Sequence, residues 1–307
     1  ERFSFYGMRA ILVIFMTQYL MGSNGLLDTM SEEDATSYFH LFVSTAYFLP
    51  ILGAILADAL WGKYRTIIIL SLIYCAGHLA LYIDDTRIGL LLGLTLIAIG
   101  SGGIKPSIAS NVGDQFGKAN QHLLSRAFSW YYFGINIGSS TSSLLTPWLL
   151  VNFGPSIAFG VPGIFMLLAT ITYWLGRHKF VHIPPTGRSY LKEILGNEGR
   201  RVAKRLIVIY ILIAAFWSLF DQMGSTWVLQ AQNMNRTVFG YELLSAQIQS
   251  ANPFLILILI PVFTYLIYPF LGRFFLPTAK RKMCIGMFLA ATPFLVTAWI
   301  EHQIQIG

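Results

Sequence analysis

The charged side chains at the start of the chain are its first candidates for chemistry, because they lead directly into an apolar segment. Arg2, Tyr6 and Arg9 precede residues 10–21, which carry no formal charge. On a helix these three side chains are spaced i, i+4 and i+7 and share one face. Two guanidinium groups beside a phenol suit a carboxylate, because arginine presents a planar fork of donors that keeps its charge. The alternative is that they snorkel to a helix end, but Arg9 lies about two turns deeper than Arg2.

Two more ionisable groups interrupt long apolar runs. Lys105 lies in the small-residue segment Gly100 to Ser107, and Asp221 lies in a later run. A solitary charge in such a run indicates a functional residue, because an apolar environment makes it costly. Lysine can also lose its proton when it is desolvated, which arginine effectively cannot. The alternative for Lys105 is a structural pair with one buried acid.

Aromatic and amide side chains recur at helical spacing near these charges. Tyr132 and Asn136 are four residues apart, as are Trp217 and Asp221, so each pair shares a helix face. Tyr47 lies near the middle of the second apolar run. Asn136 also has a structural alternative, as a polar link between packed helices.

The elements that must position these residues are membrane helices. The chain is 55% hydrophobic and 11% charged, whereas an ordinary soluble domain is about 25% charged. Charge-poor runs of transmembrane length recur, and they lack the short alternating pattern of barrel strands. The sequence therefore predicts an all-α polytopic membrane protein with about nine helices. The runs are centred near Val13, Phe48, Leu72, Ala98, Gly138, Phe165, Ala214, Ile258 and Ala291.

The net charge of +7 is explained by topology rather than by a nucleic-acid partner. If the N-terminus is cytoplasmic and each run crosses once, sixteen of the 21 Lys and Arg residues fall on the cytoplasmic side and only Arg87 and Arg236 outside. This distribution follows the positive-inside rule. We therefore expect a multi-pass protein of the cell membrane with a cytoplasmic N-terminus.

A basic, proline-containing linker divides the chain. We predict a six-helix bundle at residues 1–178, a cytoplasmic linker at 179–204 and the first three helices of a second bundle at 205–307. Because an even arrangement of six plus six helices is expected, we expect three further helices and therefore a longer chain of which this sequence is a piece. The two cysteines, Cys75 and Cys284, fall in predicted membrane helices and form no disulfide framework.

Five motifs, in order along the chain, resemble those of a known family. The segment Asp58 to Arg65, with Gly62 and Lys63, is similar to the loop motif between the second and third helices of the major facilitator superfamily. The other motifs resemble those of the proton-dependent oligopeptide transporters within that superfamily. These are Glu1-Arg2-Phe3-Ser4-Phe5-Tyr6-Gly7-Met8-Arg9, Gly102-Gly103-Ile104-Lys105-Pro106 with Asp114-Gln115-Phe116, Tyr132 to Ser139, and Phe216-Trp217 with Asp221 to Ser225 and Asn252-Pro253.

The resemblance implies import of di- and tripeptides with protons, by alternating access between two six-helix bundles. Protons are the coupling ion, and no other cofactor is expected. It implies that Arg2 and Lys105 hold the peptide carboxylate and that Glu1, Arg2 and Lys105 together couple proton movement. The other implied substrate-binding residues are Tyr6, Tyr47, Tyr132, Asn136, Trp217 and Asn252. We further predict that Arg9 and Asp221 pair across the cavity when the outer side is closed, and that the protein functions as a monomer.

Two other classes of protein remain as alternatives. A nitrate or other small-anion carrier of the same family would also use a wall of Arg and Lys, although the acid at Glu1 favours peptide uptake. An intramembrane enzyme would need a nucleophile with a base or a metal cluster. His78 has no partner in the sequence, and HExxH and GxSxG motifs are absent. The chain departs from the family pattern in having Phe5 where Tyr is usual and in lacking the tenth-helix Glu that is expected to meet the peptide amine.

Overall fold

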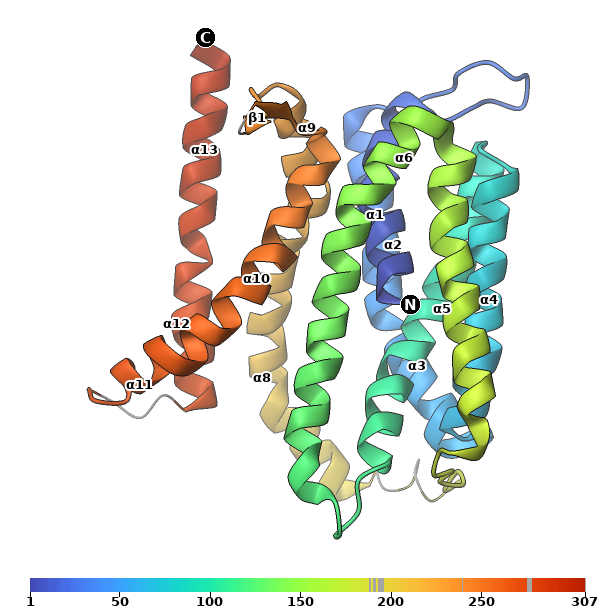
Figure 1. Cartoon of the computed structure of the whole chain (residues 1–307), viewed down its shortest axis with the longest axis vertical. Coiled ribbons are helices and arrows are strands. Elements are labelled where there is room, and N and C mark those ends of the chain that lie inside the picture. The colour runs from blue at the N-terminus through green and yellow to red at the C-terminus, as the bar shows by residue number, and fades with distance from the viewer. Residues whose placement is uncertain (188, 190–191, 193–195, 239, 275–277, 307) are drawn as a thin grey trace.

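The computed structural model describes residues 1–187, 189, 192, 196–238, 240–274 and 278–306. The N-terminal half contains seven named helices and forms one helical body (Figure 1). They are α1 (Arg2–Gln18), α2 (Glu32–Phe48), α3 (Pro50–Ile55), the π-helix η1 (Leu56–Trp61), α4 (Lys63–Ile83), α5 (Arg87–Asp114) and α6 (Leu124–Leu175), with the 3-10 turns η2 (Gln121–Leu123) and η3 (Gly176–His178) flanking α6.

The C-terminal half continues with helices and one short hairpin. Its helices are α8 (Asn197–Phe220), η4 (Asp221–Gly224), α9 (Thr226–Gln232), η5 (Ser245–Ser250), α10 (Ala251–Val262), η6 (Phe263–Ile267), α11 (Tyr268–Leu271), α12 (Ala279–Leu289) and α13 (Ala291–Ile306). The strands β1 (Thr237–Val238) and β2 (Tyr241–Glu242) pair antiparallel, with Thr237 opposite Glu242. This hairpin was not predicted from the sequence.

Among the described residues, six helical segments are long and apolar enough to cross a membrane, or seven if the bent pair 197–207 and 209–232 counts as one span. One of the six contains both arms of α6, which reverse direction at Gly154, where φ is +81° (Figure 1). Glycine adopts this conformation without the steric cost of a Cβ. With α1, which has 17 residues, each of the nine predicted runs corresponds to a helical segment, so the polytopic all-α prediction is confirmed.

Local features set several helix boundaries. Helix α2 begins at Glu32 because Ser31 caps it, accepting a hydrogen bond from the Asp34 amide at 3.1 Å. Helix α5 contains Pro106 and continues to Asp114. The ninth run forms two consecutive helices, α12 and α13.

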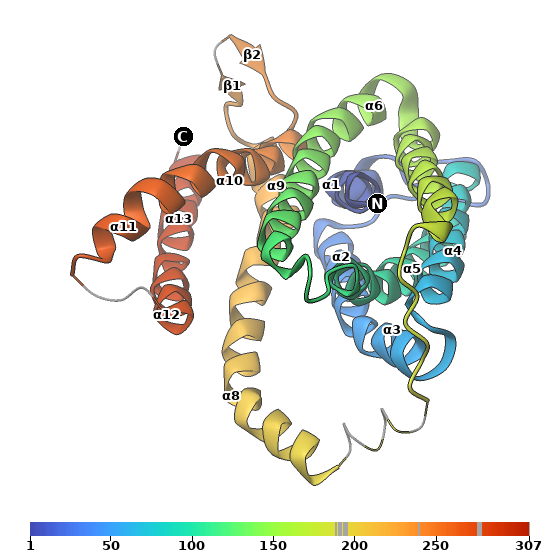
Figure 2. The ribbon, with the colours of Figure 1, turned by 60° about the horizontal axis from the view of Figure 1, so that its bottom comes forward.

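Helix α1 is the centre of the N-terminal half. Residues 7–16 are all buried, and α2, α4, α5 and α6 surround the helix (Figure 2). Small residues permit close contact with α6: a Cβ on Gly7 would lie 2.8 Å from the Thr146 methyl group, and the Thr146 hydroxyl donates to the Gly7 carbonyl at 2.9 Å. Helices in membranes pack through such small residues. The charged side chains of α1 are therefore held on a rigid, buried element.

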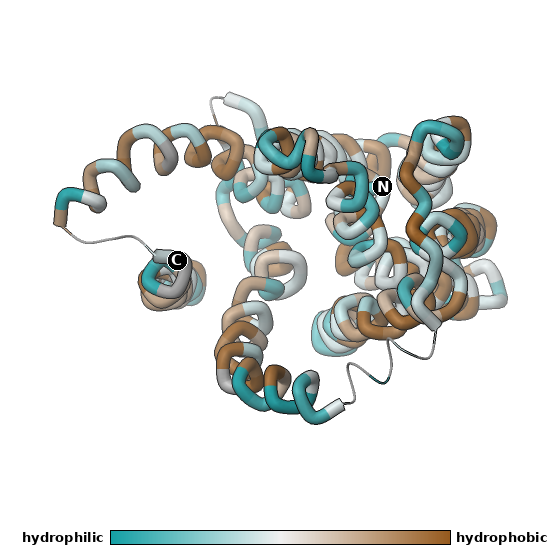
Figure 3. Tube along the Cα trace, turned by 90° about the horizontal axis from the view of Figure 1, so that it is seen from below, coloured by the Kyte–Doolittle hydropathy of each residue, from teal (hydrophilic) through white to brown (hydrophobic). Residues whose placement is uncertain are grey.

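The outward faces of the helices are apolar. Many of their large hydrophobic side chains are exposed, including Leu41, Leu92, Ile164 and Leu255. Hydrophilic residues gather instead at helix ends, as at the linker end of α8 (Figure 3). This is the arrangement of a protein whose surface faces lipid.

Candidate functional site

An ion pair joins the two halves of the chain. Arg9 of α1 lies with its Nη2 atom 2.5 Å from Oδ1 of Asp221 in η4, and the two side chains are only 6% and 8% exposed. The guanidinium also lies 5.3 Å from the Phe39 ring centroid. A Cβ on Gly224 would approach Arg9 Nη2 to 3.2 Å, so glycine there leaves room for the pair.

A second polar contact lies beside this pair. The His40 ring of α2 is hydrogen-bonded through Nε2 to the Ser225 hydroxyl at 3.0 Å. Sequence reasoning missed both residues, although His40 is seven residues before Tyr47 and therefore shares its helix face. This seven-residue spacing from Tyr47 was the signal in the sequence that could have indicated His40 as a residue of the site.

A cavity of about 670 Å³ lies between α2 and α8. Asp221 and His40 line one part of it, and Tyr47 and Trp217 line another, with their ring centroids 6.1 Å apart. The structure thus brings Tyr47 together with the predicted pair Trp217 and Asp221 from a distant part of the sequence. A cavity of this size is within the range of small-molecule sites, about 300–1,000 Å³.

Lys105 reaches the same region from α5. Its Nζ atom lies 4.0 Å from the Phe5 ring centroid and 4.4 Å from that of Tyr47, which lines the cavity. No described side chain or backbone group forms a hydrogen bond with this buried ammonium, and no described acid lies within ion-pair distance of it. The structural alternative, a Lys paired with a buried acid, is therefore not what the described residues form.

Glu1 and Arg2 form an adjacent pair. The Arg2 Nε atom lies 3.1 Å from Glu1 Oε2, and the side chains are 18% and 11% exposed. The other Glu1 oxygen, Oε1, is buried and has no hydrogen-bond donor among the described residues. Tyr6, one turn further along α1, is half-buried and contacts the Phe5 ring edge-on, with centroids 5.6 Å apart. The Glu1 carboxylate thus has one oxygen atom that accepts no hydrogen bond from the described residues.

The remaining predicted binding residues are placed differently. Asn136 is 4% exposed, and its amide donates to the Tyr132 carbonyl at 2.9 Å, so one of its donors is used within its own helix. The Tyr132 side chain is 45% exposed. Asn252, the second residue of α10, is half-buried. No described contact joins these three residues to Lys105.

Two glutamines that the sequence analysis did not single out link the halves near Asn252. The Gln249 amide donates to the Ala10 carbonyl at 3.2 Å, and the Gln247 amide donates to the Leu144 carbonyl at 2.9 Å. Amide side chains in apolar runs commonly form hydrogen bonds between helices. The sequence therefore could not show that these two glutamines join the two halves of the chain.

The cytoplasmic loop motif is built around Gly62 and Lys63. Gly62 has φ +80°, which suits glycine, and Lys63 Nζ lies 2.6 Å from Asp114 Oδ2 at the end of α5. Arg65 is exposed. Within the described part of the chain, the ion pair of this motif joins Lys63 to Asp114, whereas Asp58 accepts the Thr186 amide through its backbone carbonyl at 2.8 Å.

The described residues contain no group of three or more His, Cys, Asp or Glu side chains that could hold a metal ion. The site therefore consists of cations, acids and aromatic rings. Such a set can bind a zwitterion and can exchange protons at a carboxylate.

Comparison with known proteins decides the family. Residues 64–197 and 192–306 match the profile of the POT family. The chain belongs to the POT family. It is 36% identical to Peptide transporter family 1 of Drosophila melanogaster and 36% identical to Solute carrier family 15 member 2 of Rattus norvegicus, over 99% of this chain in each case. These alignments cover 46% and 48% of the two relatives, so the chain spans just under half of their length.

A solved POT structure has the same arrangement of helices. The POT family transporter PepTSo superimposes with a TM-score of 0.87 at 35% identity, over 100% of this chain and 74% of that one. The major facilitator fold expected from the sequence is therefore confirmed. The motif segments at Glu1–Arg9, Lys105 and Asp221 lie within this POT match.

Proposed function

We propose that this POT family protein imports di- and tripeptides together with protons. The observation that carries the proposal is the Lys105 ammonium, which is buried against Phe5 and Tyr47 and has no acid partner among the described residues. A buried cation is costly unless an anion joins it. The carboxylate of a peptide in the cavity beside Tyr47 would supply that anion.

The charge distribution suits a peptide backbone, which has a carboxylate at one end and an ammonium at the other. Arg2 and Lys105 form the cationic side, and Asp221 supplies a carboxylate beside the cavity. Tyr6, Tyr47, Tyr132 and Trp217 would tolerate varied side chains, because aromatic rings offer apolar surface with limited polar demand. Asn136 and Asn252 would contribute amide contacts to the peptide. The names of the Drosophila and rat relatives, a peptide transporter and a solute carrier, support this function.

Glu1 is the proposed proton carrier. In this structure its carboxylate contacts Arg2 Nε at 3.1 Å. A peptide carboxylate that engages Arg2 and Lys105 would compete for that contact and free Glu1 to accept a proton. Substrate binding and protonation are thereby coupled through one guanidinium group.

The contacts between halves support an inward-facing state. The hydrogen bonds and ion pairs between residues 1–178 and residues 205–307 include Arg9–Asp221, His40–Ser225, Gln247–Leu144 and Gln249–Ala10. The four residues from the second half belong to η4, to η5 and to the position just before α9. Helix α9 lies at the β1–β2 end of the molecule (Figure 1), which the positive-inside rule assigns to the exterior. We propose that residues 1–178 and 205–307 belong to separate bundles joined by a cytoplasmic linker at 179–204, and that the protein acts as a monomer in the cell membrane with its N-terminus inside.

Uptake by the full-length protein in proteoliposomes tests the proposal. A labelled dipeptide should accumulate when an inward proton gradient is imposed, and collapse of the gradient with a protonophore should stop accumulation. Unlabelled di- and tripeptides should compete and nitrate should not. Gradient-driven accumulation of nitrate, with no peptide uptake, would contradict the proposal.

A further inference from the structure

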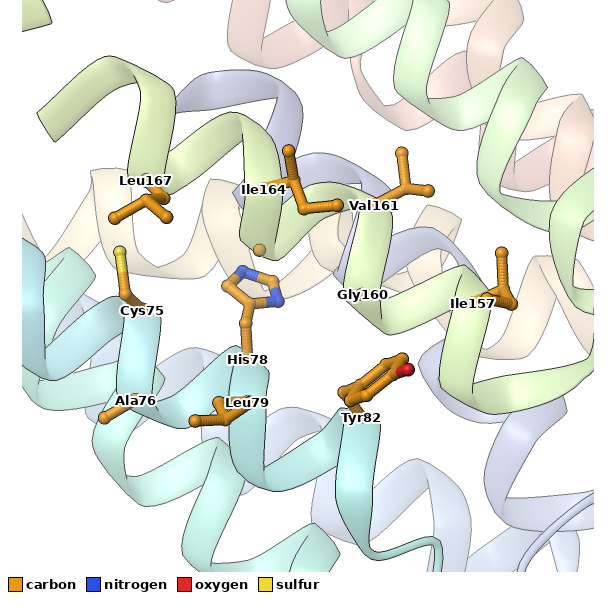
Figure 4. A pocket seen from close by; sticks show the side chains of 11 residues that line it. Cys75, Ala76, His78, Leu79, Tyr82, Ile157, Gly160, Val161, Ile164 and Leu167 are labelled. Atoms are coloured by element: carbon orange, nitrogen blue, oxygen red, sulfur yellow. The ribbon is translucent and has the colours of Figure 1, made fainter. Parts of the chain in front are cut away.

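Most of the exposed surface of the spanning helices is apolar. In the groove between α4 and the second arm of α6, for example, Leu79, Ile164 and Leu167 line the walls and are 55%, 58% and 45% exposed (Figure 4). Such a surface faces lipid. A covalent modification made by an enzyme in the aqueous phase therefore has to be sought at the polar loops.

The loop that follows α9 contains the tripeptide Asn235-Arg236-Thr237. Asn-x-Thr, with x other than Pro, is the acceptor sequence for N-linked glycosylation. No other asparagine in the sequence is followed two residues later by Ser or Thr. The tripeptide leads into the β1–β2 hairpin, at the end of the molecule that the positive-inside rule assigns to the exterior (Figure 1). This acceptor sequence therefore falls on the side of the membrane where the modification is made.

Asn235 lies beyond the hydrocarbon core of the membrane. The basic residues of α8 end at Arg205, and a core of about 30 Å takes about 20 helical residues. A span that starts after Arg205 therefore leaves the core near Ser225, about ten residues before Asn235. The residues beyond that point include the polar side chains of Gln230 and Asn233.

Arg236 fixes the middle of the tripeptide to the protein. Its guanidinium donates to the backbone carbonyls of Ala231, Gln232 and Leu243 at 2.8, 2.9 and 2.8 Å. It also pairs with Glu242 at 3.0 Å, and the Arg236 side chain is only 19% exposed. The loop is thus held against the end of α9 by its central residue.

The two residues on either side of Arg236 are exposed. The Thr237 amide donates to Asn235 Oδ1 at 3.0 Å. Among the described residues, no hydrogen-bond partner occupies Asn235 Nδ2 or the Thr237 hydroxyl. The side-chain amide receives the glycan, and the hydroxyl completes the acceptor sequence. Both groups that the reaction needs are therefore available at the surface.

We propose that Asn235 carries an N-linked glycan on the exterior of the cell. The co-reactant is an oligosaccharide donated from a lipid pyrophosphate. A bond forms between Asn235 Nδ2 and the anomeric carbon of the sugar, the bond from that carbon to the pyrophosphate oxygen breaks, and the amide loses one proton as the lipid pyrophosphate leaves. This inference rests on the proposed orientation in the membrane and is independent of the proposed transport of peptides.

Glycopeptide mapping of the full-length protein expressed in insect cells tests the proposal. Protein at the cell surface is labelled with a membrane-impermeant biotin reagent and purified, so that the sample has passed through the secretory pathway. Peptide N-glycosidase in heavy-oxygen water converts a glycosylated asparagine to an isotope-labelled aspartate, which mass spectrometry locates in the sequence. Position 235 should carry the label in most of the wild-type protein. Unmodified Asn235 throughout the surface sample would overturn the proposal.

Variants of the tripeptide test the assignment independently. Asn235→Gln and Thr237→Ala should each remove one glycan, seen as faster migration of the protein on a gel, whereas Thr237→Ser should retain it because serine also supplies a hydroxyl. Asn233→Gln, at an exposed position in the same loop, is the matched control and should keep the glycan.

A glycan at position 235 that persists in Thr237→Ala would contradict the assignment. Dipeptide uptake by Asn235→Gln in proteoliposomes should equal that of the wild type, because Nδ2 of Asn235 has no partner among the described residues. The glycan and the transport function can therefore fail separately, and the two experiments distinguish which of them is wrong.

Discussion

Arg9 and Asp221 are 212 residues apart in the chain, yet the Arg9 Nη2 and Asp221 Oδ1 atoms lie 2.5 Å apart in a setting almost closed to solvent. Two unit charges about 4 Å apart attract by about 4 kcal/mol at an effective dielectric of 20, and desolvation offsets much of this. A modest net energy suits a contact that must form and break in the proposed transport cycle.

Exchange of the two charges tests whether this ion pair is the outer gate. Arg9→Asp and Asp221→Arg should each lower peptide uptake about tenfold or more, because each sets two like charges side by side in a buried position and shifts the states by more than about 1.4 kcal/mol. The double variant should recover part of the uptake. The same exchange at Arg87 and Asp28, whose side chains are about half exposed, should have little effect, since exposed pairs contribute about 0–1 kcal/mol. A double variant no better than the worse single would argue against a gate.

Replacement of Glu1 tests proton coupling. Glu1→Gln removes the protonatable group beside Arg2 but keeps the shape of the side chain, so gradient-driven uptake should be lost while counterflow exchange of labelled for unlabelled dipeptide continues. Glu32→Gln, at an exposed position near the start of α2, is the control and should retain both activities. Unchanged gradient-driven uptake in Glu1→Gln would remove this residue from the mechanism.

An amidated dipeptide tests the role of Lys105. Wild-type protein should bind the free acid about tenfold or more tightly than the amide, because a charge-assisted hydrogen bond contributes about 1.5–3 kcal/mol. Lys105→Gln should reduce this ratio toward one, whereas Lys118→Gln, at an exposed turn, should preserve it. Competition against a labelled dipeptide in proteoliposomes gives both affinities. A preference for the free acid that persists in Lys105→Gln would assign the carboxylate to other residues.

We expect the stability of the protein to depend on the close contact between Gly53 of α3 and Gly103 of α5. A Cβ on Gly53 would lie 2.3 Å from the Gly103 Cα, so Gly53→Ala must push α3 away from α5, at a cost of about 1–3 kcal/mol. Gly134→Ala is the matched control, because nothing lies within 4 Å of that position and alanine favours a helix by about 1 kcal/mol. The thermal unfolding midpoint of the purified protein should fall for Gly53→Ala only. Equal unfolding midpoints for Gly53→Ala and Gly134→Ala would show that α3 can shift away from α5 without loss of stability.

Much of this protein could be predicted from composition and spacing. Membrane-length apolar runs determine spanning helices because unpaired backbone groups are excluded from lipid, so each of the nine runs corresponds to a helical segment. Isolated charges are rare in such runs, which made Arg9, Lys105 and Asp221 stand out. The family followed from the same residues, because their order along the chain is specific.

Tertiary structure alone decided which of these residues meet. Helix spacing assigns a side chain to a face of its own helix, but the approach of η4 to α1 depends on close packing at small residues such as Gly224. For the same reason the sequence could not show that Lys63 pairs with Asp114 while Asp58 does not, or that His40 reaches Ser225. Those relationships depend on contacts between segments far apart in the chain, and no local pattern encodes such contacts.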